Sequence, residues 1–103
     1  MLEEKEQLEY NVEHYLCEKL NEKGCLTFKF VSPGRKGVPD RIVLTKKGVV
    51  YFIETKRPVG GRVSPLQKYW QKMIEIRHGK YALVINKKEV LELIAEMEKN
   101  DEI

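Results

Sequence analysis

A segment with a helical pattern lies between two strand-like segments, and this order constrains the fold more than any other feature of the sequence. The strand-like segments cover residues 49–56 and 81–85, and the predicted helix covers residues 65–78. Ser64 is typical of a helix N-cap, and Gly79 is expected to end the helix. A strand that returns through a helix to the same sheet pairs in parallel, so we expect a parallel pair with a crossover helix. Because residues 81–85 are apolar throughout, both faces of that strand are expected to be buried.

The sequence before this unit predicts a β-hairpin. Residues 41–45 also have the composition of a strand, and a three-residue link that ends in Gly48 joins them to the next strand. Such a link is typical of a hairpin with a bulge. The other predicted elements are a helix over residues 2–23 that ends at Gly24, a strand over residues 25–31, and a last helix capped by Asn86 and Glu89. The order α-β-β-β-α-β-α predicts one α/β domain over residues 1–103, with a four-stranded mixed sheet flanked by helices.

Composition excludes several other classes of protein. Hydrophobic residues make up 42% of the chain, which is too many for a disordered protein. The longest apolar run, residues 49–53, is far shorter than the roughly 20 residues of a membrane helix, so we expect no membrane segment. The acidic N-terminus does not have the pattern of a secretory signal. Cys17 and Cys25 are too few for a disulfide framework or a four-cysteine zinc site, so we expect reduced thiols in a cytosolic protein.

Basic residues gather in the middle of the chain. From Lys29 to Lys68 there are ten basic and two acidic residues, whereas the whole chain has a net charge of only +3. A basic region of this kind is typical of a protein that binds nucleic acid, and an ordinary solvated surface is the alternative. Tyr69 or Trp70 on the predicted helix can stack on a base, and packing in the core or in a dimer is the other explanation.

The hairpin brings two carboxylates together in this basic region. If Thr45 pairs with Val49 and the register is counted outward, Asp40 falls opposite Glu54, with Cβ atoms about 4.5–5.5 Å apart. Lys56 lies two residues after Glu54 and therefore on the same face of the strand. Since facing like charges destabilise a sheet, the pair needs a cation nearby.

Two kinds of cation can serve this pair of carboxylates. Lys56 can form a plain ion pair, which is a common surface arrangement of little energetic value. A divalent metal such as Mg²⁺ is the alternative, because it takes one or two carboxylates and keeps sites for phosphate and water. A bound metal would activate that water, and Lys56 would orient or deprotonate it.

These residues resemble a known superfamily. Pro39-Asp40, thirteen intervening residues and Glu54-Thr55-Lys56 are similar to the signature of the PD-(D/E)XK nucleases. The string over residues 30–41, FVSPGRKGVPDR, resembles the VRR-NUC branch, the virus-type replication-repair nucleases. So does Ser64-Pro65-Leu66-Gln67 at a helix start, followed by Gly79 and an apolar strand. The resemblance covers about residues 12–94.

The resemblance implies a DNA endonuclease that depends on Mg²⁺ or Mn²⁺. Its implied metal ligands are Asp40, Glu54, the backbone carbonyl of Thr55 and a carboxylate from the first helix, with Lys56 assisting the nucleophile. For that helix we choose Glu13, directly or through water, over its competitors Glu6 and Glu9. Gln67 has two explanations that the sequence leaves open. It either lines the active site, as the family implies, or forms a capping box with Ser64.

The resemblance also implies partners and a location. Small stand-alone members, often encoded by phages and prophages, resemble homodimeric Holliday-junction resolvases, so we expect a homodimer that cuts branched DNA. The expected location is the cytoplasm of a bacterial or phage-infected cell. A non-catalytic basic module that binds nucleic acid is the alternative function. The expected phosphate contacts are Arg35, Lys36, Arg41, Arg57, Arg62 and Lys68.

Overall fold

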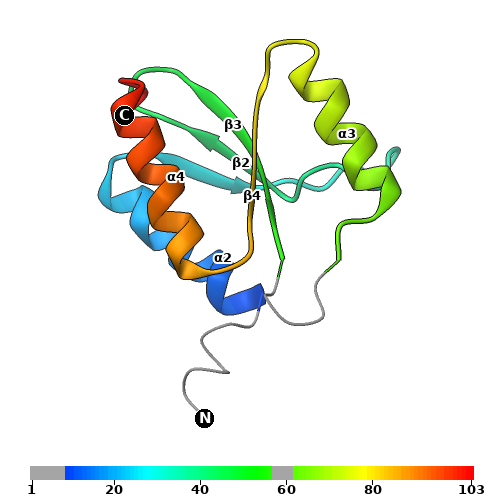
Figure 1. Cartoon of the computed structure of the whole chain (residues 1–103), viewed down its shortest axis with the longest axis horizontal. Helices are drawn as coiled ribbons and strands as arrows, with labels where there is room; N and C mark the ends of the chain where they lie inside the picture. The colour runs from blue at the N-terminus through cyan, green and yellow to red at the C-terminus, as the bar shows by residue number, and fades with distance from the viewer. Residues whose placement is uncertain (1–8, 57–61) are drawn as a thin grey trace.

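The computed structural model describes residues 9–56 and 62–103, which form an α/β fold (Figure 1). The elements in chain order are α2 (Glu9–Glu22), β1 (Leu26–Lys29), β2 (Arg41–Leu44), β3 (Val50–Thr55), α3 (Pro65–Glu75), β4 (Lys80–Val84) and α4 (Lys87–Lys99). The strands form one sheet in the order β1-β2-β3-β4. The β1–β2 and β2–β3 pairs are antiparallel and the β3–β4 pair is parallel. The predicted mixed sheet and parallel crossover pair are therefore confirmed.

Helices α2 and α4 lie side by side and cover one side of the sheet, whereas α3 lies apart from them and packs beside β4 (Figure 1). Helix α2 packs through one apolar face, because Val12, Leu16 and Leu20 recur at spacings of four residues and have no exposed surface. Burial of each such side chain stabilises the fold by about 1.5–3 kcal/mol. Gly24 ends α2 with a φ of +80°, as predicted. The predicted start of this helix, residues 2–8, lies outside the described residues.

The turn between β2 and β3 sets the register of the hairpin. The Thr45 amide donates to the Val49 carbonyl at 2.9 Å, and Gly48 has a φ of +81° and donates to the Thr45 carbonyl at 3.0 Å. This turn is the predicted three-residue link with a left-handed glycine. The ladder continues to the pair of Arg41 with Ile53. One further step puts the next two residues, Asp40 and Glu54, opposite each other, as the sequence predicts.

Strand β4 differs from its prediction. It lies at the edge of the sheet, and Leu83 is 36% exposed whereas Val84 is 1% exposed. The expectation that both faces are buried is therefore wrong. An apolar run shows that a strand has at least one buried face, but it does not tell an edge strand from a central one.

The end of α3 also differs from its prediction. The helix ends at Glu75 rather than near His78, and His78 itself adopts the left-handed conformation, with a φ of 63°. Gly79 is required for a different reason, because a Cβ there would lie 2.6 Å from Cγ2 of Ile74. Its amide donates to the Ile74 carbonyl at 2.9 Å. The glycine therefore allows the chain to pass close to the last turn of the helix before β4 begins.

No helix within the two described segments combines the length and the apolar character needed to cross a membrane.

Candidate active site

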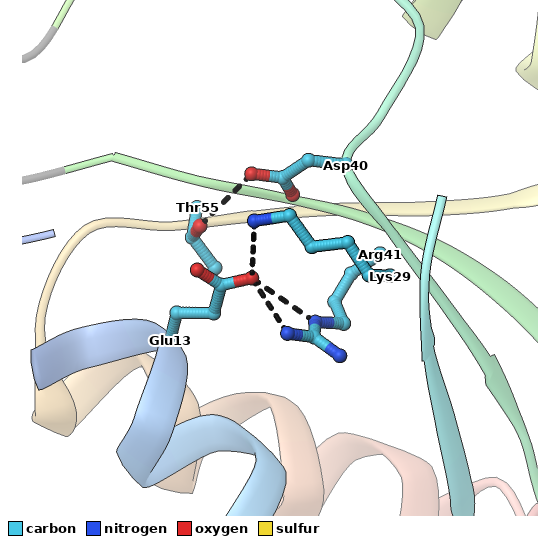
Figure 2. A network of polar contacts seen from close by, with 5 residues as sticks. All are labelled: Glu13, Lys29, Asp40, Arg41 and Thr55. Carbon is cyan, nitrogen blue, oxygen red and sulfur yellow. Dashed lines mark hydrogen bonds and ion pairs between the residues drawn. The ribbon is translucent and has the colours of Figure 1, made fainter. Parts of the chain in front are cut away.

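Asp40 and Glu54 lie at the open end of the β2–β3 hairpin, opposite its turn. Glu54 is only 3% exposed, and the oxygens Asp40 Oδ1 and Glu54 Oε1 are both buried. Carboxylates are rarely buried without compensating groups, so the contacts around them define the site. Thr55 Oγ1 donates to Asp40 Oδ2 at 3.3 Å (Figure 2). The sequence analysis implicated only the backbone carbonyl of Thr55, and its hydroxyl is an additional group that holds Asp40.

Glu54 is held from two sides. Its Oε2 accepts a hydrogen bond from Gln67 Nε2 at 3.2 Å and lies 3.6 Å from Lys56 Nζ. The Lys56 side chain is 16% exposed, so its ammonium and the Glu54 carboxylate form a largely buried ion pair. Removing one partner of such a pair is costly, because the other charge is left buried without compensation. Three of the predicted residues, Glu54, Lys56 and Gln67, are thus in contact.

The capping explanation of Gln67 is confirmed, and the same side chain also contacts Glu54. Its Oε1 accepts from the Ser64 amide at 2.9 Å, and Ser64 Oγ accepts from the Gln67 amide at 3.1 Å, which completes the capping box of α3. Because the amide oxygen is used by the cap, the amide nitrogen faces Glu54, where only a donor fits. The N-terminal cap of α3 therefore also orients Glu54.

Tyr81 is a residue at the site that the sequence analysis missed. It pairs with Phe52 in the parallel β3–β4 ladder, so it lies on the same face as Glu54. Burial, then the charges of Glu54 and Asp40, raise the pKa of the Tyr81 phenol to about 12. Its hydroxyl is buried and makes no hydrogen bond with the described part of the chain. The charges of both carboxylates thus act on this buried hydroxyl, which stays protonated and can donate a hydrogen bond at neutral pH.

Glu13 points from α2 toward this region but has other partners. Its Oε2 accepts from Arg41 at 2.8 Å (Nη2) and 3.1 Å (Nε) and lies 3.4 Å from Lys29 Nζ (Figure 2). Among the residues that the structure describes, no cluster of three or more His, Cys, Asp or Glu side chains is arranged to hold a metal. The register therefore places Asp40 opposite Glu54, whereas Glu13 forms no metal-binding cluster with them. Glu6 and the side chain of Glu9 lie outside the described residues.

The predicted phosphate contacts fall into three groups. Arg41 differs from the expectation, because its side chain is 16% exposed and its guanidinium binds Glu13 instead of facing solvent. Arg57 lies outside the described residues. The remaining four, all on the exposed surface, are Arg35, Lys36, Arg62 and Lys68.

The chemistry of Asp40 and Glu54 fits a hard divalent cation. Asp40 and Glu54 occupy opposed positions next to the β2–β3 ladder, where both could supply oxygen ligands. Mg²⁺ is held by one or two carboxylates, with water or phosphate in its other positions. The Thr55 carbonyl follows Glu54 directly in the same strand. The Lys56 ammonium next to Glu54 provides a positive charge at the edge of such a site.

Two comparisons place the chain among known proteins. A solved structure described as "VRR_NUC domain" has a TM-score of 0.80 and 30% sequence identity, over 84% of this chain and 94% of that one. The protein described as "Putative nuclease p44", from Acyrthosiphon pisum secondary endosymbiont phage 1, is 42% identical over 59 residues. Those residues are 57% of this chain and 62% of the phage protein, so the match spans less than two thirds of that relative. No family model matches the chain.

The mixed sheet and the carboxylates and lysine at the β2–β3 pair define a protein of the PD-(D/E)XK class. Within that class, the chain belongs to the VRR-NUC family, as the likeness to the solved structure shows. The resemblance identified from the sequence is thereby confirmed.

We predict that Tyr81→Phe alters the alkaline unfolding of the protein. The folded chain binds the phenol proton more tightly than the unfolded chain, in which tyrosine titrates near 10, so wild-type stability should fall as pH rises from about 10 toward 12. Tyr81→Phe should reduce this slope, measured by urea unfolding at several pH values. Burial also raises the pKa of Tyr51, so part of the slope should remain. An unchanged slope in the variant would contradict the placement of Tyr81.

We predict that Gln67→Glu separates the two roles of Gln67. Glutamate keeps the capping acceptor but places a second carboxylate against Glu54, so the variant should lose roughly 1–3 kcal/mol of unfolding free energy at pH 7. The loss should shrink as pH falls, because protonation of one carboxyl of the pair removes the repulsion. Urea unfolding from pH 3 to 7 measures this.

The double variant Glu54→Gln/Gln67→Glu is the matched control, and it should recover stability at pH 7 relative to Gln67→Glu alone. If Gln67→Glu instead has wild-type stability across this pH range, Gln67 does not face Glu54.

Proposed function

We propose that this chain is a nuclease that hydrolyses phosphodiester bonds of DNA with Mg²⁺ or Mn²⁺ as its metal ion. The observation that carries the proposal is that Asp40 lies opposite the buried Glu54, which Lys56 contacts, in a chain of the VRR-NUC family. The name of the related phage protein, which is described as a nuclease, agrees with it. The proposal takes residues 1–103 as one catalytic domain.

In the proposed mechanism, Asp40, Glu54 and the Thr55 carbonyl would hold the metal, and Glu13 would contribute directly or through a water molecule. When bound, the metal supplies the activation of water and the neutralisation of charge on the phosphate. The residues around the carboxylates position these ligands. Thr55 Oγ1 fixes Asp40, and Gln67 Nε2 fixes Glu54, so neither carboxylate has to reorganise when substrate arrives.

Lys56 is proposed to act on the attacking water. Its ammonium lies 3.6 Å from Glu54 Oε2 and is only partly exposed, so it is held at the site before substrate binds. From this position the ammonium would orient the water by a hydrogen bond. Alternatively, the amine, after releasing its own proton to bulk water, would accept the proton of the attacking water. Tyr81 would donate a hydrogen bond to the substrate or to water, since its phenol stays protonated.

The finer features of the substrate are also proposals. The exposed residues Arg35, Lys36, Arg62 and Lys68 would contact phosphates and position the DNA without reading its sequence. We propose a homodimer, since two active sites suit a branched substrate that is cut on two strands. The proposed location is the cytoplasm of a bacterial or phage-infected cell.

We predict that Asp40→Asn and Lys56→Met each lower cleavage at least about 100-fold while DNA affinity stays within about threefold, because the exposed basic residues remain. The assay uses plasmid and four-way-junction DNA with Mg²⁺, Mn²⁺ or chelator, together with sedimentation for the oligomeric state. Lys88→Met is the matched control, since Lys88 is an exposed lysine on α4, and it should cleave as the wild type does.

Wild-type cleavage by Asp40→Asn would overturn the assigned site. Binding with a steep salt dependence and no cleavage under any metal condition would instead support the non-catalytic alternative.

A further inference from the structure

A cavity of about 410 Å³ lies between α3 and the sheet, outside the cluster of Asp40, Glu54 and Lys56. Its walls are apolar and aromatic, and two guanidinium groups lie among them. The residues that carry the argument are Phe52, Tyr69, Trp70 and Met73 for the walls and Arg35 and Arg77 for the charge. This volume is in the range of small-ligand sites, about 300–1,000 Å³.

Helix α3 gives this cavity its apolar wall. The helix carries apolar side chains along one face, yet none of its residues is buried. Tyr69 is 48% exposed, so it is not part of the core. Within the described chain neither Tyr69 nor Trp70 belongs to the core, and both rings line the cavity. Packing in a dimer stays the alternative explanation for the two rings.

The cavity is adjacent to the proposed active site along both of its walls. On β3, Phe52 and Glu54 are two residues apart and share one face, at a separation of about 7 Å along the strand. On α3, Gln67 and Trp70 are three residues apart and share one side of the helix. Each wall thus supplies one residue to the cavity and one to the site.

The shape and charge of the walls fit a planar ring that carries a phosphate. The Tyr69 and Trp70 rings are nearly perpendicular, with centroids 5.0 Å apart and an interplanar angle of 78°. The Arg35 guanidinium lies 5.4 Å from the Trp70 ring centroid, so a cationic plane stands next to an aromatic face. Unpaired bases stack on aromatic rings and on arginine, and arginine also binds the attached phosphate.

The walls are held in place without a ligand. Trp70 Nε1 donates to the Lys36 carbonyl at 2.7 Å, which fixes the loop that carries Arg35 against α3. Arg77 Nη1 donates to the Met73 carbonyl at 3.0 Å. A ligand would therefore lose little affinity to the ordering of these walls.

We propose that this cavity binds one unpaired nucleobase of the DNA substrate, next to the phosphodiester that is cut. The inference rests on the proposed function for its choice of DNA. A nuclease with such a cavity should prefer DNA that has an unpaired nucleotide near the cleavage position over a fully paired blunt duplex.

Trp70 is the single tryptophan of the chain, so its fluorescence reports on the cavity alone. The test titrates the protein, in chelator so that no cleavage occurs, with a short single-stranded oligonucleotide and with an oligonucleotide of abasic sites of the same length. Both carry the same phosphates. Quenching by the first and not by the second is the expected result, because only the first has bases to stack.

Tyr69→Ala should weaken binding of the single-stranded oligonucleotide by about five- to hundredfold, measured by anisotropy of a labelled strand. Leu91→Ala is the matched control, since Leu91 is 49% exposed on α4, and it should bind as the wild type does. Equal quenching by the abasic oligonucleotide, or no quenching by either, would overturn the nucleobase site. A change in fluorescence with protein concentration alone would also overturn it, because a second copy would then fill the cavity.

The two proposals fail separately. Cleavage that depends on Asp40 without base-dependent quenching would remove the nucleobase site and leave the nuclease proposal standing. Base-dependent quenching without any cleavage would remove the nuclease proposal and leave the nucleobase site standing.

Discussion

The antiparallel register of β2 and β3 is the constraint on which the rest of the site depends. A three-residue turn with a left-handed Gly48 fixes that register, and the register alone determines that Asp40 meets Glu54. A slip of one residue would move one carboxylate to the other face of the sheet. The turn lies at the opposite end of the hairpin from the carboxylates, so the geometry of a few loop residues determines the chemistry about five residues away.

Carboxylates at opposed positions of a sheet are unfavourable unless other groups compensate for them. Thr55 donates to Asp40, while Gln67 and Lys56 hold Glu54. These contacts also leave each carboxylate in one orientation. Acidic groups held in place in this way by residues of β3 and α3 are typical of sites at which function and stability conflict.

Much of this arrangement could be predicted from the sequence because it depends on local rules. The hairpin link gave the register of Asp40 and Glu54, and strand periodicity placed Lys56 beside Glu54. The capping box identified Gln67 as a helix cap, but its second contact depends on where α3 lies against β3, which no local pattern encodes. Tyr81 was missed for a related reason, since the register of a parallel pair is set by the whole crossover and not by a turn.

Long side chains were the least predictable part. Arg41 follows Asp40 in the sequence and was expected to contact phosphate. Its guanidinium instead forms an ion pair with Glu13 of α2. The same contact keeps Glu13 apart from the two strand carboxylates. The pairing of charges between elements that are distant in the sequence depends on packing distances, which residue type and spacing do not supply.

Electron paramagnetic resonance of Mn²⁺ tests the central claim, that the carboxylates of residues 40 and 54 form one cation site. Titration of the wild-type protein should show bound Mn²⁺, and Asp40→Asn and Glu54→Gln should each weaken that binding at least about tenfold. Wild-type Mn²⁺ affinity in either variant would show that the two carboxylates do not share an ion.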